Sequence, residues 1–399
     1  MVIHVVQAGE RLYSIAKEYG VDPALLAAET GFSLQQALVL GQTVVVQFPD
    51  VVHRVRSGER LSAIARQYGT DVTTLYRNNR WLMGRSTIRE GDLLVISYFG
   101  APRGRFAVSA YAYATIERGL LRSVLPYLSN LIPFTYGLTQ SGGLLPLADE
   151  ELLAIAADYE TRPVMHLSTI TEEGTFSNGR ASMVLNDPAL QQRLAAEVLE
   201  TIQRKGYTGL DVDFEFIFPE ERERYAEFVA LLRRTLAPHG YPVTVALAPK
   251  TAADQRGLLY EGHDYALLGA AADHVFLMTY EWGYTYGPPM AVAPLPNVRQ
   301  VLDYAVTAIS PSKLLLGIPN YGYDWPLPFI QGQTRAQSIS NQRAIQLALE
   351  HRVDIQYDTT AQAPFFYYTD LAGTVHEVWF EDARSLAAKL ELIAEYGLM

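Results

Sequence analysis

An internal duplication is the feature that most constrains the fold of this 399-residue chain. Residues 4–20, HVVQAGERLYSIAKEYG, align with residues 53–69, HRVRSGERLSAIARQYG, at a constant offset of 49. Similarity this dense at a fixed period indicates two copies of one small structural unit rather than chance. We therefore expect two N-terminal modules, at residues 1–49 and 50–98.

Both copies carry the same order of secondary-structure signals. A short alternating strand leads into a Gly-Glu-Arg turn and then into a helix that ends at a glycine. A second helix follows, and β-branched strands at 43–48 and 93–97 close the two units. Each copy is therefore predicted to be a βααβ module. The apolar face of the first helix consists of Leu12, Ile15, Ala16 and Tyr19 in one copy and Leu61, Ile64, Ala65 and Tyr68 in the other.

These units resemble the LysM module over residues 2–48 and 51–97. The resemblance implies binding to polymers that contain N-acetylglucosamine, such as peptidoglycan or chitin. It also implies a binding groove between two loops of each copy, which are residues 8–12 with 38–42 and residues 57–61 with 88–92. Many members carry Asp-Thr or Asp-Ser after the glycine of the first loop, whereas both copies here carry Glu-Arg.

Composition excludes several classes of function. The net charge of −11, with no local run of Lys and Arg, argues against nucleic acid as a partner. The absence of cysteine excludes disulfides, thiolate metal sites and a cysteine nucleophile. No segment approaches the roughly 18 apolar residues of a membrane span, and residues 1–9 lack the features of a secretory signal. We expect a soluble protein without a membrane partner that is monomeric and needs no cofactor.

After a linker at 99–104, apolar strand-like runs alternate with helical segments, which is typical of a parallel sheet with crossover helices. The seven predicted strands are 106–112, 130–136, 163–169, 209–216, 242–248, 274–280 and 313–319. One helix is clearly bounded, because Asp187 can cap it, Pro188 suits its first turn and Gly206 can end it.

Seven such units predict an α/β fold, a (β/α)8 TIM barrel over residues 105–399. The chain ends where an eighth strand should begin, so we expect that strand to lie beyond the given sequence. A small α+β insertion is predicted at 325–382, after strand seven, with a hairpin formed by 365–369 and 374–380.

The segment Gly-Leu-Asp-Val-Asp-Phe-Glu-Phe at 209–216 carries the chemistry. The period of two along a strand sends Asp211, Asp213 and Glu215 to one face and apolar residues to the other. In a barrel the acids would line the interior, with Glu215 nearest the C-terminal mouth, where barrel enzymes keep their active sites. Mutual repulsion and burial should raise the pKa of at least one carboxyl group, as a general acid requires.

Residues 208–215 resemble the Asp-Gly-x-Asp-x-Asp-x-Glu signature of glycoside hydrolase family 18, the chitinase family, with Thr208 in place of the first Asp. In this family the acetamide of the substrate is the nucleophile. The resemblance implies that Glu215 protonates the glycosidic oxygen and then activates water. It further implies that Asp213 holds the acetamide and that Asp211 shares a proton or hydrogen bond with Asp213.

A second segment, Met278 to Glu281, is similar to the Met-x-Tyr-Asp motif of the same family. The resemblance gives Tyr280 the role of supporting the acetamide oxygen, and Glu281 replaces the Asp. Residues at other strand ends are further candidates for substrate binding: Tyr136, Lys250, Met278, Glu281, Trp282, Asn320, Tyr321 and Asp324.

No His or further carboxylate lies at ligand spacing around the three acids, so no catalytic metal is expected. The scattered histidines, such as His166 and His274, are interpreted as hydrogen-bonded core residues.

The order of modules, together with the motifs at 281–289 and 320–325, resembles the spore cortex-lytic N-acetylglucosaminidases of endospore-forming bacteria. This resemblance implies action on peptidoglycan fragments and a location in the spore coat or cortex, reached without a signal peptide. The cytoplasm and the cell wall are alternative locations. Two other functions stay open, a chitinase and a glycan-binding protein without catalysis, and the presence of Glu215 argues against the second.

Overall fold

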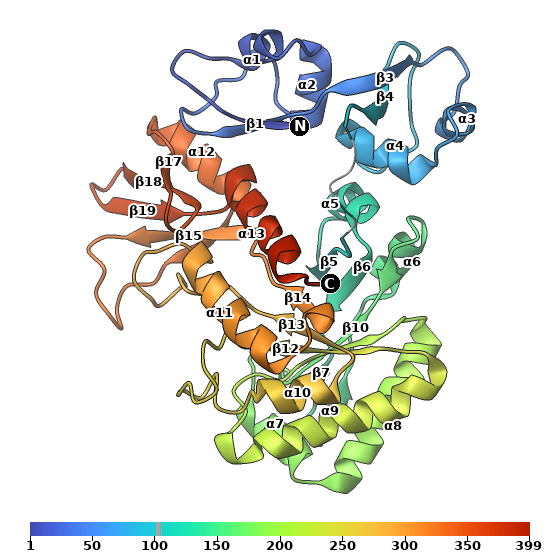
Figure 1. Ribbon diagram of the computed structural model, residues 1–399, viewed down its shortest axis with the longest axis vertical. Coiled ribbons are helices and arrows are strands. Elements are labelled where there is room, and N and C mark those ends of the chain that lie inside the picture. Colours follow the sequence, from blue (N-terminus) through green and yellow to red (C-terminus); the bar gives the residue numbers. More distant parts are fainter. Residues whose placement is uncertain (101–103, 105) are drawn as a thin grey trace. The chain divides into compact units, whose positions relative to one another are not determined.

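The computed structural model describes residues 1–100, 104 and 106–399 (Figure 1). Residues 101–103 of the predicted linker, and Arg105, lie outside the described residues. The chain forms two compact units, and each consists of several segments. The first unit comprises Met1–Arg105, Tyr280–Val298 and Ile318–Leu392, and the second comprises Phe106–Thr279, Arg299–Gly317 and Ile393–Met399.

Both N-terminal repeats adopt the predicted βααβ arrangement. The first consists of β1 (Val2–Val5), α1 (Leu12–Glu18), α2 (Pro23–Thr30) and β2 (Thr43–Val46). The second consists of β3 (Pro49–Arg54), α3 (Leu61–Gln67), α4 (Val72–Asn78), the 3₁₀ turn η1 (Arg80–Leu82) and β4 (Leu93–Tyr98). In each repeat the two strands pair antiparallel.

A buried histidine explains why both copies carry Glu after the glycine of the first turn. In the first repeat the Nε2 atom of His4 lies 2.8 Å from the Glu10 carboxylate, and its Nδ1 atom lies 3.1 Å from the Tyr19 hydroxyl. The same Glu10 carboxylate accepts a hydrogen bond from the Gln7 amide. The second repeat reproduces these contacts with His53, Glu59, Tyr68 and Arg56. Glu10 and Glu59 therefore fix the turn of the module.

The rest of the first unit contains a five-stranded antiparallel sheet in the order β16-β15-β19-β18-β17. Its elements are β15 (Tyr321–Pro326), β16 (Gln337–Ser340), α12 (Asn341–His351), β17 (Gln356–Asp358), β18 (Ala363–Thr369), β19 (Val375–Trp379) and α13 (Ala383–Tyr396). The predicted hairpin forms as β18 and β19. The sheet begins at Tyr321, slightly before the predicted start of the insertion at residue 325.

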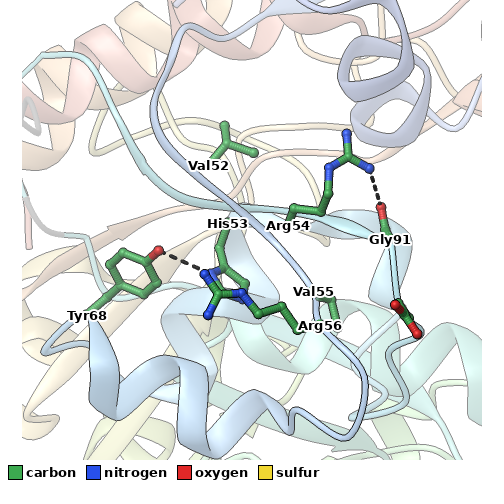
Figure 2. Close-up of a pocket in the computed structure, with 8 residues that line it drawn as sticks. Val52, His53, Arg54, Val55, Arg56, Tyr68 and Gly91 are labelled. Carbon is green, nitrogen blue, oxygen red and sulfur yellow. Dashed lines mark hydrogen bonds between the residues drawn. The ribbon is translucent and has the colours of Figure 1, made fainter.

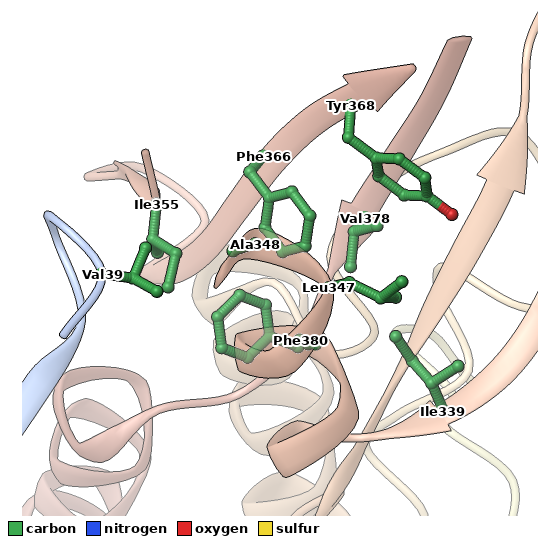
Figure 3. Packing of buried hydrophobic residues seen from close by; sticks show 10 residues of the cluster. Val39, Ile339, Leu347, Ala348, Ile355, Phe366, Tyr368, Val378 and Phe380 are labelled. Atoms are coloured by element: carbon green, nitrogen blue, oxygen red, sulfur yellow. The ribbon is translucent and has the colours of Figure 1, made fainter. Parts of the chain in front are cut away.

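The first repeat docks on this sheet through residues 39–41, which we call the docking loop. Val39 lies in one buried cluster with Ile355 and Phe366 (Figure 3). The Ile355 amide donates a 2.9 Å hydrogen bond to the carbonyl of Leu40. A Cβ atom on Gly41 would lie 1.9 Å from the carbonyl oxygen of Ile355, so only glycine fits at this position.

The second unit contains seven parallel strands in sequence order. They are β5 (Ser109–Tyr113), β6 (Asn130–Phe134), β9 (Arg162–Pro163) with β10 (Met165–Ser168), β11 (Leu210–Asp213), β12 (Val243–Leu247), β13 (His274–Leu277) and β14 (Leu314–Leu316). We count β9 and β10 as one strand because a single residue separates them. A minor antiparallel pair is formed by β7 (Gly137–Leu138) and β8 (Leu144–Leu145). The amide of Met399 donates to the carbonyl of Leu314 at 3.1 Å.

Helices connect these strands, as the alternating pattern predicts. They are α5 (Arg118–Val124), α6 (Glu150–Ala157), α7 (Asn178–Leu185), α8 (Pro188–Lys205), α9 (Arg222–Leu236), α10 (Tyr265–Ala271) and α11 (Leu295–Ala308). The bounds predicted for α8 are confirmed, because Asp187 accepts hydrogen bonds from two first-turn amides and Gly206 ends the helix in the left-handed conformation.

Three strand predictions run three residues past the C-terminal ends of the observed strands, including the one at 313–319, which ends at Leu316. The strand predicted at 209–216 ends at Asp213, because Phe216 has a φ of 56° and turns the chain out of the extended conformation. The strand predicted at 274–280 ends at Leu277, where the Thr279 amide turns back to the Leu277 carbonyl. Glu215 and Tyr280 therefore lie on the loops that follow the strands.

The apolar face of β11 packs on a helix, as predicted. Phe214 is fully buried and stacks on Tyr225 of α9, with ring centroids 5.7 Å apart. Within the described part of the chain, no helix combines the length and the apolar character that crossing a bilayer requires.

We predict that Gly41→Ala destabilises the first unit more than Gly91→Ala. Both glycines have positive φ, so each substitution costs about 1–2 kcal/mol of backbone strain. Only the methyl group at position 41 meets another atom, since a Cβ on Gly91 has nothing within 4 Å. Denaturant unfolding of the two variants should show the larger loss for Gly41→Ala, and equal losses would contradict the described docking.

Candidate active site

Strand β11 presents two of the three predicted acids from a fully buried segment. The side chains of Asp211 and Asp213 are almost inaccessible, and Glu215 is half-buried on the following loop. The strand lies between β10 and β12, and its register places His166 beside Asp211 and Ser168 beside Asp213. The sequence pattern therefore correctly groups the acids at the C-terminal end of one central strand.

Asp211 is the anchored member of the group. Its Oδ2 atom accepts a 2.8 Å hydrogen bond from the Tyr111 hydroxyl and lies 2.8 Å from Nδ1 of His166. Phe134 stacks on the His166 ring at a centroid distance of 5.0 Å, and Tyr111 meets the same ring edge-on at 5.2 Å. The two aromatic contacts fix the imidazole, which in turn fixes the Asp211 carboxylate.

Asp213 is buried close to two other acidic groups but has few hydrogen-bond partners. Its Oδ2 atom is 3.6 Å from Nε2 of His166, which is too long for a hydrogen bond. Among the described residues, no partner is found for Oδ1 of Asp213, Oδ1 of Asp211 or Nε2 of His166, although all three atoms are buried. These unpaired atoms give the site free hydrogen-bonding capacity that a ligand can use.

Burial raises the pKa of Asp213 well above its usual range, and the charges of Glu215 and Asp211 raise it further. A carboxyl group with a raised pKa keeps its proton at a pH where an ordinary aspartate has lost it. Asp213 can then donate a hydrogen bond to a carbonyl oxygen as well as accept one.

His263 supports the loop that carries Glu215. Its Nδ1 atom accepts from the Ala248 amide at 2.9 Å, and its Nε2 atom donates to the Phe214 carbonyl at 2.9 Å. Burial lowers the pKa of His263 to about 4, so the ring is neutral and can make both contacts. The histidine thus ties the end of β12 to the residue before Glu215.

Sequence reasoning missed the places of Tyr111, His166 and His263 in this site. His166 is a hydrogen-bonded core residue, as interpreted, but its partner is the acid cluster itself. The predicted strands 163–169 and 209–216 place His166 and Asp211 at different distances from their ends, so only the observed register of β10 on β11 shows that these residues are neighbours. Tyr111 is 100 positions from its partner and gave no local signal.

Three of the predicted substrate-binding residues belong to the second unit, and two are already engaged. Tyr136 is buried and donates to Asp149 at 2.7 Å. The ammonium group of Lys250 donates to the carbonyls of Ala253 and His263 at 3.0 and 3.1 Å. Met278 is half-buried on the loop after β13. The polar atoms of Tyr136 and Lys250 are therefore bound by other parts of the second unit.

The other predicted residues, Tyr280, Glu281, Trp282, Asn320, Tyr321 and Asp324, belong to the first unit. Glu281 accepts hydrogen bonds from the hydroxyls of Tyr321 and Tyr323. Burial raises the pKa of Glu281, and the two hydroxyl contacts oppose this shift. Sequence reasoning missed Tyr323, which shares the carboxylate with Tyr321.

Asp324 is a buried structural acid within the sheet of the first unit. Its two carboxylate oxygens are 2.7 Å from the Tyr368 hydroxyl and 2.7 Å from Nδ1 of His376. Tyr280 is half-buried beside a cluster that contains Trp325. Trp282 is half-buried and Asn320 is exposed.

The described residues offer one cluster with ligand spacing for a metal, formed by His4, Glu10 and Glu18. Both ring nitrogens of His4 are already engaged by Tyr19 and Glu10. The second repeat makes the same two contacts, which explains the cluster as part of the module scaffold.

Comparison with known proteins extends these observations. Residues 172–399 match the model for glycosyl hydrolases family 18, and residues 4–47 and 53–97 match the LysM domain. The cortical fragment-lytic enzyme of Bacillus cereus is 37% identical over 99% of this chain and 93% of that protein. The chain belongs to family 18 of the glycosyl hydrolases.

Two further relatives agree with this assignment. The cortical fragment-lytic enzyme of Bacillus subtilis (strain 168) is 43% identical, and the match spans 69% of this chain and 64% of that enzyme. The crystal structure of the Bacillus cereus spore cortex-lytic enzyme SleL superposes with a TM-score of 0.82 at 35% identity, covering 100% of this chain and 92% of that one. The predicted fold class, a TIM barrel of family 18 preceded by two LysM modules, is confirmed, and the chain is a glycoside hydrolase.

We predict that Asp213→Asn changes how stability depends on pH. The folded protein holds the Asp213 proton more tightly than the unfolded chain, whose aspartates titrate near pH 3.9. The stability due to this proton is complete below that pH and is lost as the pH rises through the raised folded pKa. The melting temperature of Asp213→Asn, relative to the wild type, should therefore increase between pH 5 and pH 8.

Asp211→Asn is the control for this measurement. It replaces a carboxylate that Tyr111 and His166 already bind, so it should destabilise the protein without the same gain at high pH. A pH-independent difference between Asp213→Asn and the wild type would contradict the raised pKa of Asp213.

Proposed function

We propose that this glycoside hydrolase is a retaining, substrate-assisted β-N-acetylglucosaminidase that acts on peptidoglycan fragments of the spore cortex. The observation that carries the proposal is the grouping of Asp211, Asp213 and Glu215, in which one carboxyl group is partly exposed and two are buried. Only Glu215 is accessible enough to exchange protons with substrate and water. Asp213 and Asp211 are placed to assist it.

In the first step Glu215 protonates the glycosidic oxygen while the acetamide carbonyl of the substrate attacks the anomeric carbon. The bond to the leaving sugar breaks and a cyclic oxazolinium ion forms. The raised pKa of Asp213 suits this step, since a protonated carboxyl can orient the acetamide through a hydrogen bond. In the second step the Glu215 carboxylate removes a proton from water, which attacks the anomeric carbon and restores its original configuration.

Asp211 acts through Asp213 in this proposal. Held by Tyr111 and His166, it keeps a charge or a shared proton close to Asp213 and so tunes when Asp213 ionises. Tyr280 carries over from the family motif as support for the acetamide oxygen. Lys250, Tyr136 and Asp324 have structural partners of their own and are given no direct role here.

The substrate assignment rests on the relatives. Two proteins that resemble this chain over much of its length are called cortical fragment-lytic enzymes, which favours cortex peptidoglycan over chitin and the spore cortex as the site of action. The LysM modules would hold the enzyme on glycan that contains N-acetylglucosamine.

The proposal is tested by incubating purified cortex fragments and chitin oligomers with the wild type and with Glu215→Gln. The wild type should cut cortex fragments to give N-acetylglucosamine reducing ends by mass spectrometry. Removal of the general acid should slow this reaction by about 10²–10⁴-fold. Gln keeps the size of the side chain, so both proteins should melt at similar temperatures.

Other outcomes would replace the proposal. Cutting of chitin oligomers alone would make the protein a chitinase. Binding of both substrates without cutting of either would make it a glycan-binding protein without catalysis.

A further inference from the structure

The two LysM repeats share a fold but differ in what surrounds the loop before their last strand. The loops are equivalent by their hydrogen bonds: the Gly41 amide donates to Val6 and the Gly91 amide donates to Val55, both at 2.9 Å. In the first repeat this is the docking loop, whereas the Gly91 position is open to solvent. The duplication therefore provides an internal comparison of one surface in two environments.

In the first repeat the insertion covers this surface. The Ile355 amide binds the carbonyl of Leu40, and the Arg384 guanidinium donates to the carbonyl of Gly41 at 3.2 Å. Arg384 is itself held by Asp382 at 2.7 Å and lies over the ring of Tyr357 at 4.1 Å. The carbonyl groups of Leu40 and Gly41 are thus already bound.

In the second repeat the same surface is a pocket (Figure 2). Its walls are formed by β3 and the two residues that follow it, Val55 and Arg56, by Tyr68 and by the loop at Glu90 and Gly91. Arg54 donates to the Gly91 carbonyl at 3.1 Å, which holds its guanidinium at the edge of the pocket. The Arg56 side chain is exposed and donates no hydrogen bond to any residue that the structure describes.

The charge of the two repeats differs in the same place. Residues 51–97 contain eight arginines and four acids, a net charge of +4, whereas residues 2–48 contain two basic and four acidic residues, a net charge of −2. Arg54 and Arg56 stand where the first repeat has Val5 and Gln7. Within a chain of net charge −11, the second repeat is therefore a locally basic module whose extra cations line its pocket.

We propose that the two repeats have different roles. The first repeat is a fixed connector to the insertion, and the second binds glycan that bears carboxylates at the pocket lined by Arg54 and Arg56. Peptidoglycan is such a glycan, because it carries lactyl and peptide carboxylates. The guanidinium groups suit carboxylates, because they present paired N–H donors and a permanent positive charge. The exposed Tyr68 ring offers an apolar face to a sugar. Chitin, which is neutral, lacks the group that the arginines recognise. The proposal deepens the proposed function and rests on it for the choice of glycan.

The test uses the full chain carrying Glu215→Gln, so that binding is measured without cutting. In this background Arg54→Val and Arg56→Gln install the residues that the first repeat carries at these positions. Cosedimentation with purified peptidoglycan sacculi at ~0.1 M salt should weaken about 10-fold or more, and binding to chitin beads should change little. The matched control, Arg66→Gln with Arg77→Gln, removes the same charge from exposed positions on α3 and α4, outside the pocket and the two groove loops, and should bind like the parent.

Two further experiments test the role of the glycan carboxylates and the role of the first repeat separately. Sacculi whose carboxylates have been amidated should bind the parent as weakly as native sacculi bind the Arg54→Val, Arg56→Gln protein. Adding Val5→Arg and Gln7→Arg to that protein should not restore binding, because Ile355 and Arg384 cover the adjoining edge in the first repeat.

Four results would overturn the proposal: unchanged binding by the Arg54→Val, Arg56→Gln protein, an equal loss in the Arg66→Gln, Arg77→Gln control, rescue by the first-repeat arginines, or competition by duplex DNA as effective as that of soluble sacculus fragments. If one occurs while the wild type still cuts cortex fragments, the division of work is wrong and the proposed function stands. If the wild type cuts nothing, the proposed function fails independently.

Discussion

The burial of two aspartates on β11 is the constraint on which the rest of the second unit depends. Carboxylates can be buried only where hydrogen bonds or protons compensate for lost hydration. Tyr111 and His166 provide that compensation for Asp211, whereas burial raises the pKa of Asp213 and so favours a retained proton there. The two aspartates therefore differ in environment although they are chemically identical. Glu215 is the partly exposed member of the series, which suits the proton exchange that we propose for it.

The first unit is organised by a different constraint, the close approach of the docking loop to Ile355. Gly41 leaves no room for a side chain at this contact, while Val39 adds its side chain to the buried cluster of the insertion. The first repeat is therefore packed against the five-stranded sheet instead of standing as a separate module. The second repeat, with its equivalent glycine open, keeps the corresponding surface for a ligand.

The sequence predicted those features whose signals are local. The alternation of Asp211, Asp213 and Glu215 placed the acids on one face, and Asp187 with Gly206 bounded a helix, because strand period and helix caps are written within a few residues. The strand predictions that ran past the observed C-terminal ends failed because periodicity does not reveal where the chain leaves the extended conformation, as it does at Phe216 with its positive φ.

Features made by distant residues were not predictable in the same way. His166 meets Asp211 across 45 positions, and Arg384 meets Gly41 across 343. Nor could the pattern show the hydrogen-bond partners of the predicted substrate-binding residues. Tyr136 and Asp324 stand near strand ends, yet each is held by partners that only the folded chain brings near.

The proposed mechanism breaks the glycosidic bond in two successive displacements at the anomeric carbon, so the configuration of that carbon is retained. The most direct test is proton NMR of the reaction of the wild type with cortex fragments, recorded before the product anomers equilibrate. If the mechanism is right, the new N-acetylglucosamine reducing end appears first as the β-anomer, the configuration of the bond that was cut. First appearance of the α-anomer would mean direct attack by water and would contradict the mechanism.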